Sequence, residues 1–272
     1  KKTKLAIIDA HALIHRAYHA LPPMSTDDGT PTNAVYGFTT MLLKMIATVK
    51  PTHVVAAFDM KGPTFRHTEY ADYKAHRKAL DDDLIIQFDI VRDVVRAFSI
   101  PIFEKKGFEA DDLIGTLART LENDISVVVV TGDMDTLQLV TDKTSVFTLK
   151  KGISDTILYT PELVQEKYGF EPKYVPDYKG LAGDPSDNIK GVAGIGAKTA
   201  KDLVSKYGSL EAIFEHAADL PARAQKLLVG HEEEAYFSRK LATINQDVEV
   251  DIKLDDALFE AYDEKTVREL FQ

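Results

Sequence analysis

The segment Ile125-Ser126-Val127-Val128-Val129-Val130-Thr131-Gly132-Asp133 carries the strongest fold signal in this sequence. Its first part is almost wholly apolar and β-branched, and it ends at a glycine and a carboxylate. A strand that is apolar on both faces is typical of a parallel sheet that helices cover on both sides. The segment therefore predicts an α/β fold.

Similar strand signals alternate with helical signals in the first half of the chain. The short apolar runs at residues 4–8 and 53–58 end at Asp9 and Asp59, and residues 100–103 form a third candidate strand. This alternation predicts a mostly parallel sheet with flanking helices. Apolar residues recur at helical spacing over residues 34–49, 84–98 and 111–121.

The pattern becomes mainly helical after about residue 150. A helix is expected over residues 161–168, because Pro161 suits the first position of a helix. A glycine-rich stretch at residues 180–196 follows. We expect an α/β core over residues 1–175 and a helical region over residues 176–272. The later short helices are predicted over residues 198–207, 210–216, 222–228 and 232–244.

Composition narrows the possible classes of protein. The 272 residues carry a net charge of −10 and include no cysteine. No apolar run approaches the roughly 20 residues of a membrane span, so we expect no membrane association. The lack of cysteine excludes disulfides and thiolate metal sites, and it fits a cytoplasmic protein. The negative charge argues against a nucleic-acid partner, unless many carboxylates converge on metal ions.

Several carboxylates stand where a predicted strand ends. Asp9, Asp59 and Asp133 each follow a strand, and Asp135 follows two residues later. The carboxyl ends of parallel strands meet at one edge of a sheet, so these side chains are expected to gather there. Two further acidic groups are Glu109-Ala110-Asp111-Asp112, at the start of a predicted helix, and Asp184-Pro185-Ser186-Asp187, in the later loop.

These carboxylates together predict a metal centre. A single one is more often a helix cap or a turn residue. Carboxylates that converge repel one another, and cations must neutralise them. Oxygen ligands without cysteine or a histidine cluster suit Mg²⁺ or Mn²⁺ better than Zn²⁺. Two such ions about 3.5–4 Å apart are the arrangement used for in-line phosphoryl displacement.

The stretch Gly191-Val192-Ala193-Gly194-Ile195-Gly196-Ala197-Lys198-Thr199 resembles two nucleotide-binding motifs and matches neither. A P-loop has glycine directly before its lysine, and both a P-loop and a dinucleotide fingerprint follow a strand, which is missing here. A helix–hairpin–helix fits better, because backbone N–H groups between two helices hold a DNA phosphate. Four lysines against one aspartate over residues 190–206 agree with this interpretation. A helix–turn–helix connector with solvated lysines is the alternative.

Residues 61–78 form a basic segment directly after Asp59. Five lysines and arginines stand against two acids, and Phe65, Tyr70 and Tyr73 are interleaved with them. Basic residues with aromatic residues suit single-stranded nucleic acid, because phosphates pair with the charges and bases stack on the rings. A flexible surface loop is the alternative.

These motifs resemble those of the 5′ nuclease (5′–3′ exonuclease) domain of bacterial DNA polymerase I, which is related to phage and cellular flap endonucleases. The resemblance runs from about residue 5 to about residue 214 and more loosely to the end. Ala10 and Lys190 stand where the family usually has glycine and proline, and neither change removes a ligand. The motifs that carry the resemblance are Ile8-Asp9, Arg16-Ala17, Ala34-Val35-Tyr36-Gly37-Phe38, Phe58-Asp59, Phe65-Arg66-His67, Tyr73-Lys74-Ala75-His76-Arg77, Gly107-Phe108-Glu109-Ala110-Asp111-Asp112, Thr131-Gly132-Asp133-Met134-Asp135, Gly183-Asp184-Pro185-Ser186-Asp187-Asn188 and the glycine-rich stretch 191–200.

The resemblance implies a PIN-like α/β nuclease core, a helical arch around residues 61–83, and a helix–three-turn–helix region with its hairpin loop at residues 191–199. Lys74 and Arg77 would contact the scissile phosphate, and Tyr73 would stack on a nucleotide. The implied metal ligands are Asp9, Asp59, Glu109 and Asp111 in one cluster and Asp112, Asp133, Asp135, Asp184 and Asp187 in the other. The implied DNA-binding residues are Arg16, Arg66, Lys190, Gly191, Gly194, Gly196, Lys198 and Thr199, with a K⁺ ion at the loop.

The resemblance implies a structure-specific 5′ nuclease that uses two or more Mg²⁺ or Mn²⁺ ions. It would hydrolyse phosphodiester bonds of 5′ flaps and 5′ ends in nicked or branched duplex DNA, in replication and repair. A polymerase region would be linked covalently in the parent chain, and the protein would work in the bacterial cytoplasm. Two alternatives remain: a PIN-like ribonuclease, and a DNA-binding module that holds its metals only structurally.

Overall fold

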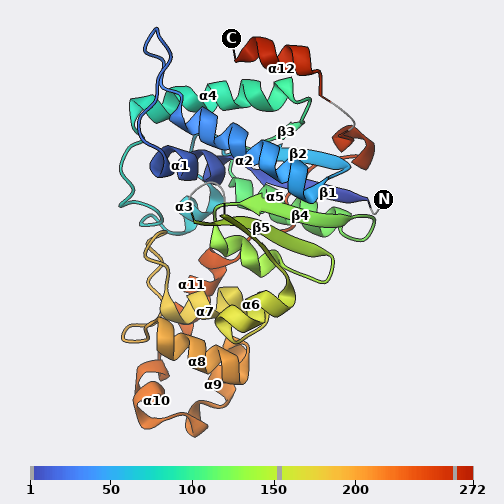
Figure 1. Cartoon of the computed structure of the whole chain (residues 1–272). Coiled ribbons are helices and arrows are strands. Elements are labelled where there is room, and N and C mark those ends of the chain that lie inside the picture. Colours follow the sequence, from blue (N-terminus) through green and yellow to red (C-terminus); the bar gives the residue numbers. More distant parts are fainter. Residues whose placement is uncertain (1–2, 152–154, 260–261, 272) are drawn as a thin grey trace.

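The computed structural model describes residues 3–151, 155–259 and 262–271 (Figure 1). Its centre is one sheet with the strand order β3-β2-β1-β4-β5-β6. The first five strands are parallel to their neighbours, and β6 runs antiparallel to β5. The predicted α/β fold is therefore confirmed. The strands are β1 (Lys4–Asp9), β2 (His53–Ala57), β3 (Ile102–Phe103), β4 (Ser126–Thr131), β5 (Thr144–Lys151) and β6 (Asp155–Tyr159).

Helices cover both faces of the sheet. Ile8 of β1 points into a cluster with α1, α2 and α4, whereas its neighbour Ile7 points into a second cluster with α5. Both faces of each central strand are buried, which explains why the strands contain almost no polar residues. Figure 1 shows α12 lying against α4, far from the helices at the other end of the molecule. The helices of this layer are α1 (Ala10–Ala20), α2 (Asn33–Val49), α3 (Phe65–Glu69), α4 (Asp82–Ala97), α5 (Ala110–Leu121) and α12 (Glu264–Leu270).

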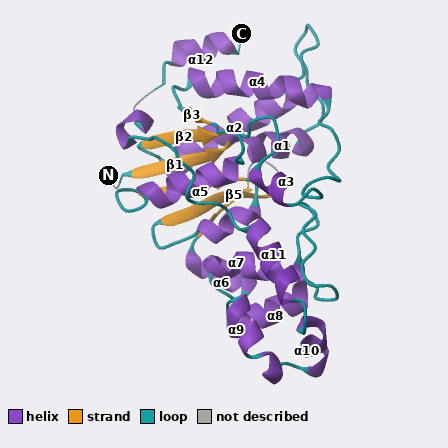
Figure 2. Cartoon of the chain, turned by 180° about the vertical axis from the view of Figure 1, so that it is seen from behind, coloured by secondary structure: helices purple, strands orange, loops and turns teal. Residues whose placement is uncertain are grey.

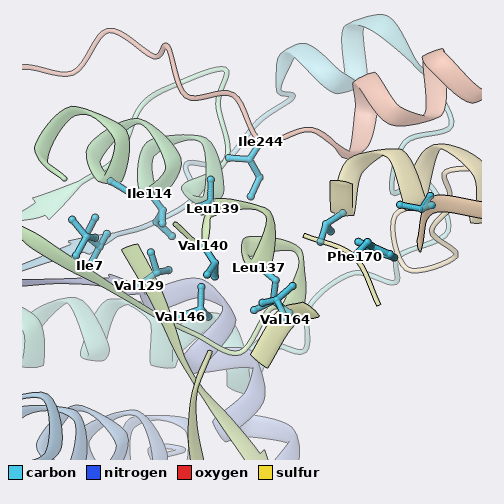
Figure 3. Packing of buried hydrophobic residues seen from close by; sticks show 14 of the residues in the cluster. Ile7, Ile114, Val129, Leu137, Leu139, Val140, Val146, Val164, Phe170 and Ile244 are labelled. Carbon is cyan, nitrogen blue, oxygen red and sulfur yellow. The ribbon is translucent and has the colours of Figure 1, made fainter. Parts of the chain in front are cut away.

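The helical region extends from one end of the sheet layer (Figure 2). Short 3-10 turns connect several of its helices. Most of its buried side chains share one cluster with the sheet layer, which runs from Val129 and Ile114 to Phe170 and Ile244 (Figure 3). Its helices are α6 (Pro161–Tyr168), α7 (Val175–Ala182), α8 (Ala197–Tyr207), α9 (Leu210–Glu215), α10 (Ala222–Leu228) and α11 (Glu232–Ala242), and the 3-10 turns are η1 (Met134–Leu139), η2 (Pro172–Tyr174), η3 (Ala217–Asp219) and η4 (Leu254–Ala257).

The chain returns from the helical region to the sheet after α11. The Val248 amide donates a hydrogen bond to Thr116 of α5 at 3.1 Å, and the Phe259 amide donates one to the carbonyl of Thr52 at 2.8 Å. The end of the predicted helical region therefore packs along the α/β core. Its last residue, Gln272, lies outside the described residues.

The predicted strands and helices are present, but the sequence patterns missed α1, α7, β5 and β6. Helix α1 starts directly after β1 without a loop, and β6 is half exposed at the edge of the sheet. Among the described residues, no helix is both long and apolar enough to cross a membrane.

Candidate metal centre and nucleic-acid interface

The sheet brings the predicted acidic residues to one edge. Parallel pairing sets Asp9 of β1 beside Ala57 of β2, and Ile8 beside Val130 of β4, so the three strands end at the same level. The residues that follow these ends line one pocket of about 640 Å³. Its acidic lining residues are Asp9, Asp59, Glu109, Asp111, Asp133, Asp135 and Asp184.

Backbone N–H groups fix these carboxylates in place. Asp9 caps α1 by accepting from the Ala12 amide at 3.0 Å, and Asp133 caps η1 by accepting from the Asp135 amide at 2.8 Å. Asp59 accepts from the Ala110 amide at 2.6 Å, at the start of α5. Helix starts carry partial positive charge, so each cap also reduces the cost of placing an anion there.

Burial and mutual repulsion act on the acids in the inner part of the pocket. Burial, together with Asp133 and Asp59, raises the pKa of Asp9 to about 7 against the lowering effect of hydrogen bonds from Thr131 and Ala12. Burial and the neighbouring Asp9 and Asp133 also raise the pKa of Asp111 well above its usual range. Within the described chain, no basic side chain forms an ion pair with Asp9, Asp111 or Asp133.

The outer part of the pocket holds a second acidic group. One oxygen from each of Asp135, Asp184 and Asp187 lies within 4.8 Å of the others. The Lys179 ammonium forms ion pairs with Asp135 and with Asp184, the latter at 2.6 Å. Burial would raise the pKa of Asp184, but Lys179 and Ser186 outweigh it and lower that pKa.

The donor set of the pocket fits divalent cations. Every candidate ligand is a carboxylate oxygen, which is the donor that Mg²⁺ and Mn²⁺ prefer. Burial and the neighbouring acids raise the pKa values of Asp9 and Asp111, and a bound cation would offset both effects by favouring the ionised carboxylates. Asp187 does not line the pocket with the other acids, but it completes the outer group.

The basic segment contributes two cations to this pocket. Lys74 Nζ lies 2.7 Å from a Glu109 oxygen, and Arg77, whose side chain is 52% exposed, bonds Asp187 at 2.6 Å. Segment 61–83 contains one short helix, α3, followed by turns, and Lys74 takes a positive φ of 55°. Both side chains also line a second pocket, of about 560 Å³, beneath this segment.

Tyr73 differs from the expectation that it stacks on a nucleotide. Its side chain is buried, and its hydroxyl donates to Glu109 at 3.1 Å and to Asp187 at 3.0 Å. Because both the ring and the hydroxyl are occupied inside the protein, Tyr73 holds the two acids together and presents no open ring face.

Arg66 and Asp112 form a buried ion pair, which corrects two expectations. The Arg66 guanidinium donates two hydrogen bonds of 2.8 Å to the two Asp112 oxygens, and it also donates to Glu109 at 3.3 Å and to the carbonyls of Leu241 and Thr243. Asp112 further accepts from the Asn245 amide at 2.9 Å. All donors of Arg66 are used inside the protein, so it is not available to DNA, and Asp112 is not available to an ion.

The predicted hairpin loop joins α7 to α8. Gly183 and Gly191 have positive φ angles of +72° and +64°. A Cβ on Gly191 would lie 2.3 Å from the Gly183 nitrogen, so the backbone can approach itself this closely only because glycine stands here. Gly196 is the N-cap of α8. Lys190, Gly194 and Lys198 of this loop are exposed, and Thr199 is half-buried.

Arg16 lies beside the pocket, on α1. Its aliphatic chain packs against Gly132, and its buried Nε atom has no hydrogen-bond partner among the described residues. Arg16 therefore lies next to the loop that carries Asp133. Among the described residues, its guanidinium forms no ion pair.

Sequence patterns missed two residues of the site. The Thr131 hydroxyl donates to Asp9 and accepts from the Asp133 amide at 2.9 Å, so it links two acidic residues. Thr131 could have been found, because it stands directly before Gly132 and Asp133. Lys179 gave no local signal, since it lies on a helix and meets Asp135 only in the folded chain.

Comparison with known proteins agrees with this geometry. A family model described as "5′-3′ exonuclease, N-terminal resolvase-like domain" matches residues 4–169, and one described as "5′-3′ exonuclease, C-terminal SAM fold" matches residues 170–265.

The chain belongs to the 5′–3′ exonuclease family.

The chain is also similar to curated proteins of two Bacillus species. DNA polymerase I of Bacillus caldotenax is 43% identical over 273 residues, and DNA polymerase I of Bacillus subtilis is 40% identical over 274 residues. Each alignment covers 100% of this chain and 31% of the relative. The chain therefore spans about a third of the length of these relatives.

Solved structures share the fold at low sequence identity. A phage T5 5′-exonuclease with bound zinc has a TM-score of 0.72 at 21% identity and covers 98% of this chain and 96% of its own. The T5 D15 flap endonuclease in a pseudo-enzyme-product complex with DNA and metal ions has the same score and identity, with 98% coverage of both chains. The catalytic core of Rad2 with DNA substrate has a TM-score of 0.61 at 14% identity, with 100% and 87% coverage.

The raised pKa of Asp9 gives this 5′–3′ exonuclease domain a testable pH dependence. Without divalent ions, folded Asp9 keeps its proton up to a pKa of about 7, whereas the ordinary value is 3.8. Its protonation therefore stabilises the folded state at low pH, and this contribution is lost as the pH rises from about 4 to about 7. In EDTA, we expect wild type to lose stability relative to Asp9→Asn over that range, measured by urea unfolding. Burial lowers the pKa of His15 to about 4, which changes stability in the opposite direction over this range. Because both proteins contain His15, its contribution cancels in the difference between their stabilities. A constant difference between the two proteins would contradict the assignment.

The Arg66–Asp112 pair gives a second prediction. Arg66→Met leaves Asp112 buried without its counter-charge, so the free energy of unfolding should fall by about 3–5 kcal/mol. The control is Arg96→Met, which removes an exposed pair with Asp93 and should change stability by about 0–1 kcal/mol. Urea denaturation in EDTA measures both variants. Equal losses in the two would show that the buried pair has no special role.

Proposed function

We propose that this chain is a metal-dependent, structure-specific 5′ nuclease that acts on 5′ flaps and 5′ ends of nicked or branched duplex DNA. The observation that carries the proposal is the acidic pocket at the carboxyl edge of the sheet, with Lys74 and Arg77 on its rim. In a chain of the 5′–3′ exonuclease family, this combination of oxygen donors and neighbouring cationic side chains suits phosphodiester hydrolysis.

The pocket has residues for two Mg²⁺ or Mn²⁺ ions. Asp9, Asp111 and Asp133 would hold the inner ion, and the outer group of Asp135, Asp184 and Asp187 would hold the other. Asp59 and Glu109 lie between the inner group and the basic segment, where they fit ligands reached directly or through water. Bound ions of this kind activate water and stabilise charge on phosphate oxygens.

Lys74 and Arg77 would bind the scissile phosphate. Both side chains now neutralise Glu109 and Asp187, and both line the two adjoining pockets. Once cations neutralise those acids, the ammonium and guanidinium groups can turn to the phosphate and balance the charge that develops on its oxygens. Tyr73 supports this arrangement by holding Glu109 and Asp187 at fixed positions.

The helical region would hold the duplex by its backbone. The loop at residues 191–199 presents exposed small residues and the start of α8, with Lys190 and Lys198 beside it. Backbone N–H groups at such a helix start bind phosphate without reading sequence. This site lies on the helical region, away from the acidic pocket, so the duplex would span both parts and place one phosphate at the acids.

The relatives suggest a longer parent protein. Because the matched DNA polymerase I chains are about three times as long as this one, we propose that a polymerase region is linked to this domain. A nuclease and a polymerase in one chain would process the same nicked duplex in replication and repair.

The first test is a cleavage assay on a nicked duplex with a labelled 5′ flap. With Mg²⁺, a short labelled product that ends near the flap junction is expected, and EDTA should abolish it. Tight binding without cleavage in Mg²⁺ or Mn²⁺ would indicate a DNA-binding module and overturn the proposal. Faster cleavage of the matched RNA substrate would favour a ribonuclease.

Asp133→Asn should remove cleavage and leave DNA binding intact. The variant keeps the shape of the η1 cap and loses one negative ligand, so we expect the single-turnover rate to fall by at least about 100-fold. The dissociation constant for the flap duplex, measured in Ca²⁺, should change little. Asp142→Asn, at an exposed loop position, is the matched control and should cleave normally. Near-normal turnover of Asp133→Asn would exclude this role.

Lys198→Ala should weaken duplex binding by a purely electrostatic route. Loss of one phosphate contact lowers the slope of log affinity against log salt by about 0.9 in magnitude. Fluorescence anisotropy between about 50 and 200 mM salt measures that slope. Cleavage at saturating enzyme should stay unchanged, because Lys198 lies outside the acidic pocket. An unchanged salt slope would remove Lys198 from the interface.

A further inference from the structure

Lys179 lies among the acids of the outer group. Its side chain is only 12% exposed, and its ammonium forms ion pairs with Asp135 and Asp184. A positive charge therefore already sits between two of the three carboxylates that come within 4.8 Å of one another.

The third acid of the outer group also has internal cations. Asp187 bonds Arg77 at 2.6 Å, and Lys74 lies 3.7 Å away. The inner acids Asp9 and Asp111 differ, since no ion pair reaches them within the described residues. The two halves of the pocket thus differ before any metal binds: cations form ion pairs with all three acids of the outer group, and no ion pair reaches Asp9 or Asp111 among the described residues.

The helix that carries Lys179 is held close to its neighbouring helix. Helix α7 packs closely on α11, because Gly180 leaves no room for a Cβ, which would lie 2.9 Å from the Ala235 carbonyl oxygen. Asp177 of the same helix is buried and bonds Arg239 at 2.8 Å. A change in the position of the ammonium must therefore come from side-chain rotation alone.

We propose that the Lys179 ammonium occupies the place of the outer divalent ion, so that the inner ion binds first and the outer ion binds only by displacing Lys179. This inference rests on the proposed function, because it assigns the two halves of the pocket to two ions. Lys179 is then a positioning residue: it keeps Asp135 and Asp184 together without metal and sets the ion concentration at which the outer half fills.

The size of the effect follows from the charge alone. A single opposite charge next to a carboxylate changes its proton affinity by about 10- to 1000-fold. Removing the ammonium should therefore raise the affinity of the outer half for a divalent ion by at least about 10-fold. In wild type, the two ions should bind in separate steps that differ by at least the same factor.

The test is a Mn²⁺ titration of the whole chain without DNA, with free Mn²⁺ followed by electron paramagnetic resonance. Wild type should bind two ions in separate steps. Lys179→Met should bind the second ion at least about 10-fold more tightly. Lys179→Arg keeps the charge and should retain the separated steps. In EDTA, Lys179→Met should also melt at a lower temperature than wild type, and Mn²⁺ should restore its stability.

Several outcomes would overturn the inference. If wild type binds both Mn²⁺ ions with equal affinity, the inference fails. It also fails if Lys179→Met binds the second Mn²⁺ ion no more tightly than wild type does. If Lys179→Met does not fold, Lys179→Gln replaces it in the same Mn²⁺ titration, with the same expected result. Weaker DNA binding with unchanged Mn²⁺ affinity would make Lys179 a phosphate contact instead. Failure of the proposed function is separate, because it would show as absent cleavage while the Mn²⁺ steps remained.

Discussion

The carboxylates that line one pocket repel one another, and the fold must hold them against that repulsion. Three helix starts do so: Asp9 caps α1, Asp133 caps η1, and Asp59 accepts from the Ala110 amide at the start of α5. In each case a backbone N–H group and the positive end of a helix face the acid. The parallel register of β1, β2 and β4 then sets these helix starts at one level, so the positions of these three acids follow from the backbone.

The same constraint explains the distribution of the basic side chains around the pocket. Lys74, Arg77 and Lys179 come from two distant segments of the chain, and each neutralises at least one acid. Arg66 acts at a deeper level, because its buried pair with Asp112 ties α3 to α5 and to the chain after α11. The helical region is thus held to the α/β core by a buried ion pair and by a shared hydrophobic cluster.

The proposed division of the pocket into an inner half without ion-paired cations and an outer half with them would have a functional consequence. An inner site that always attracts a cation would stay occupied, whereas an outer site with its own ammonium would respond to conditions. A phosphate that arrives with its own negative charge would favour exchange of that ammonium for a divalent ion. The domain would then assemble its complete metal centre only when DNA is present, which would limit cleavage elsewhere.

The sequence by itself determined the α/β fold, the acids at the strand ends and the glycine-rich loop, because apolar runs, helix spacing and turn residues are local patterns. It missed β5 and β6 at the edge of the sheet, α1, which begins without a loop, and α7, which ends inside the glycine-rich stretch. Only the tertiary structure decided which charges meet. Arg66 and Asp112 are 46 residues apart, and the Lys179 ammonium contacts Asp135, which lies on η1 in another part of the chain. The reason is physical: a local pattern shows that a side chain is charged, but its partner and its burial depend on which distant elements pack together.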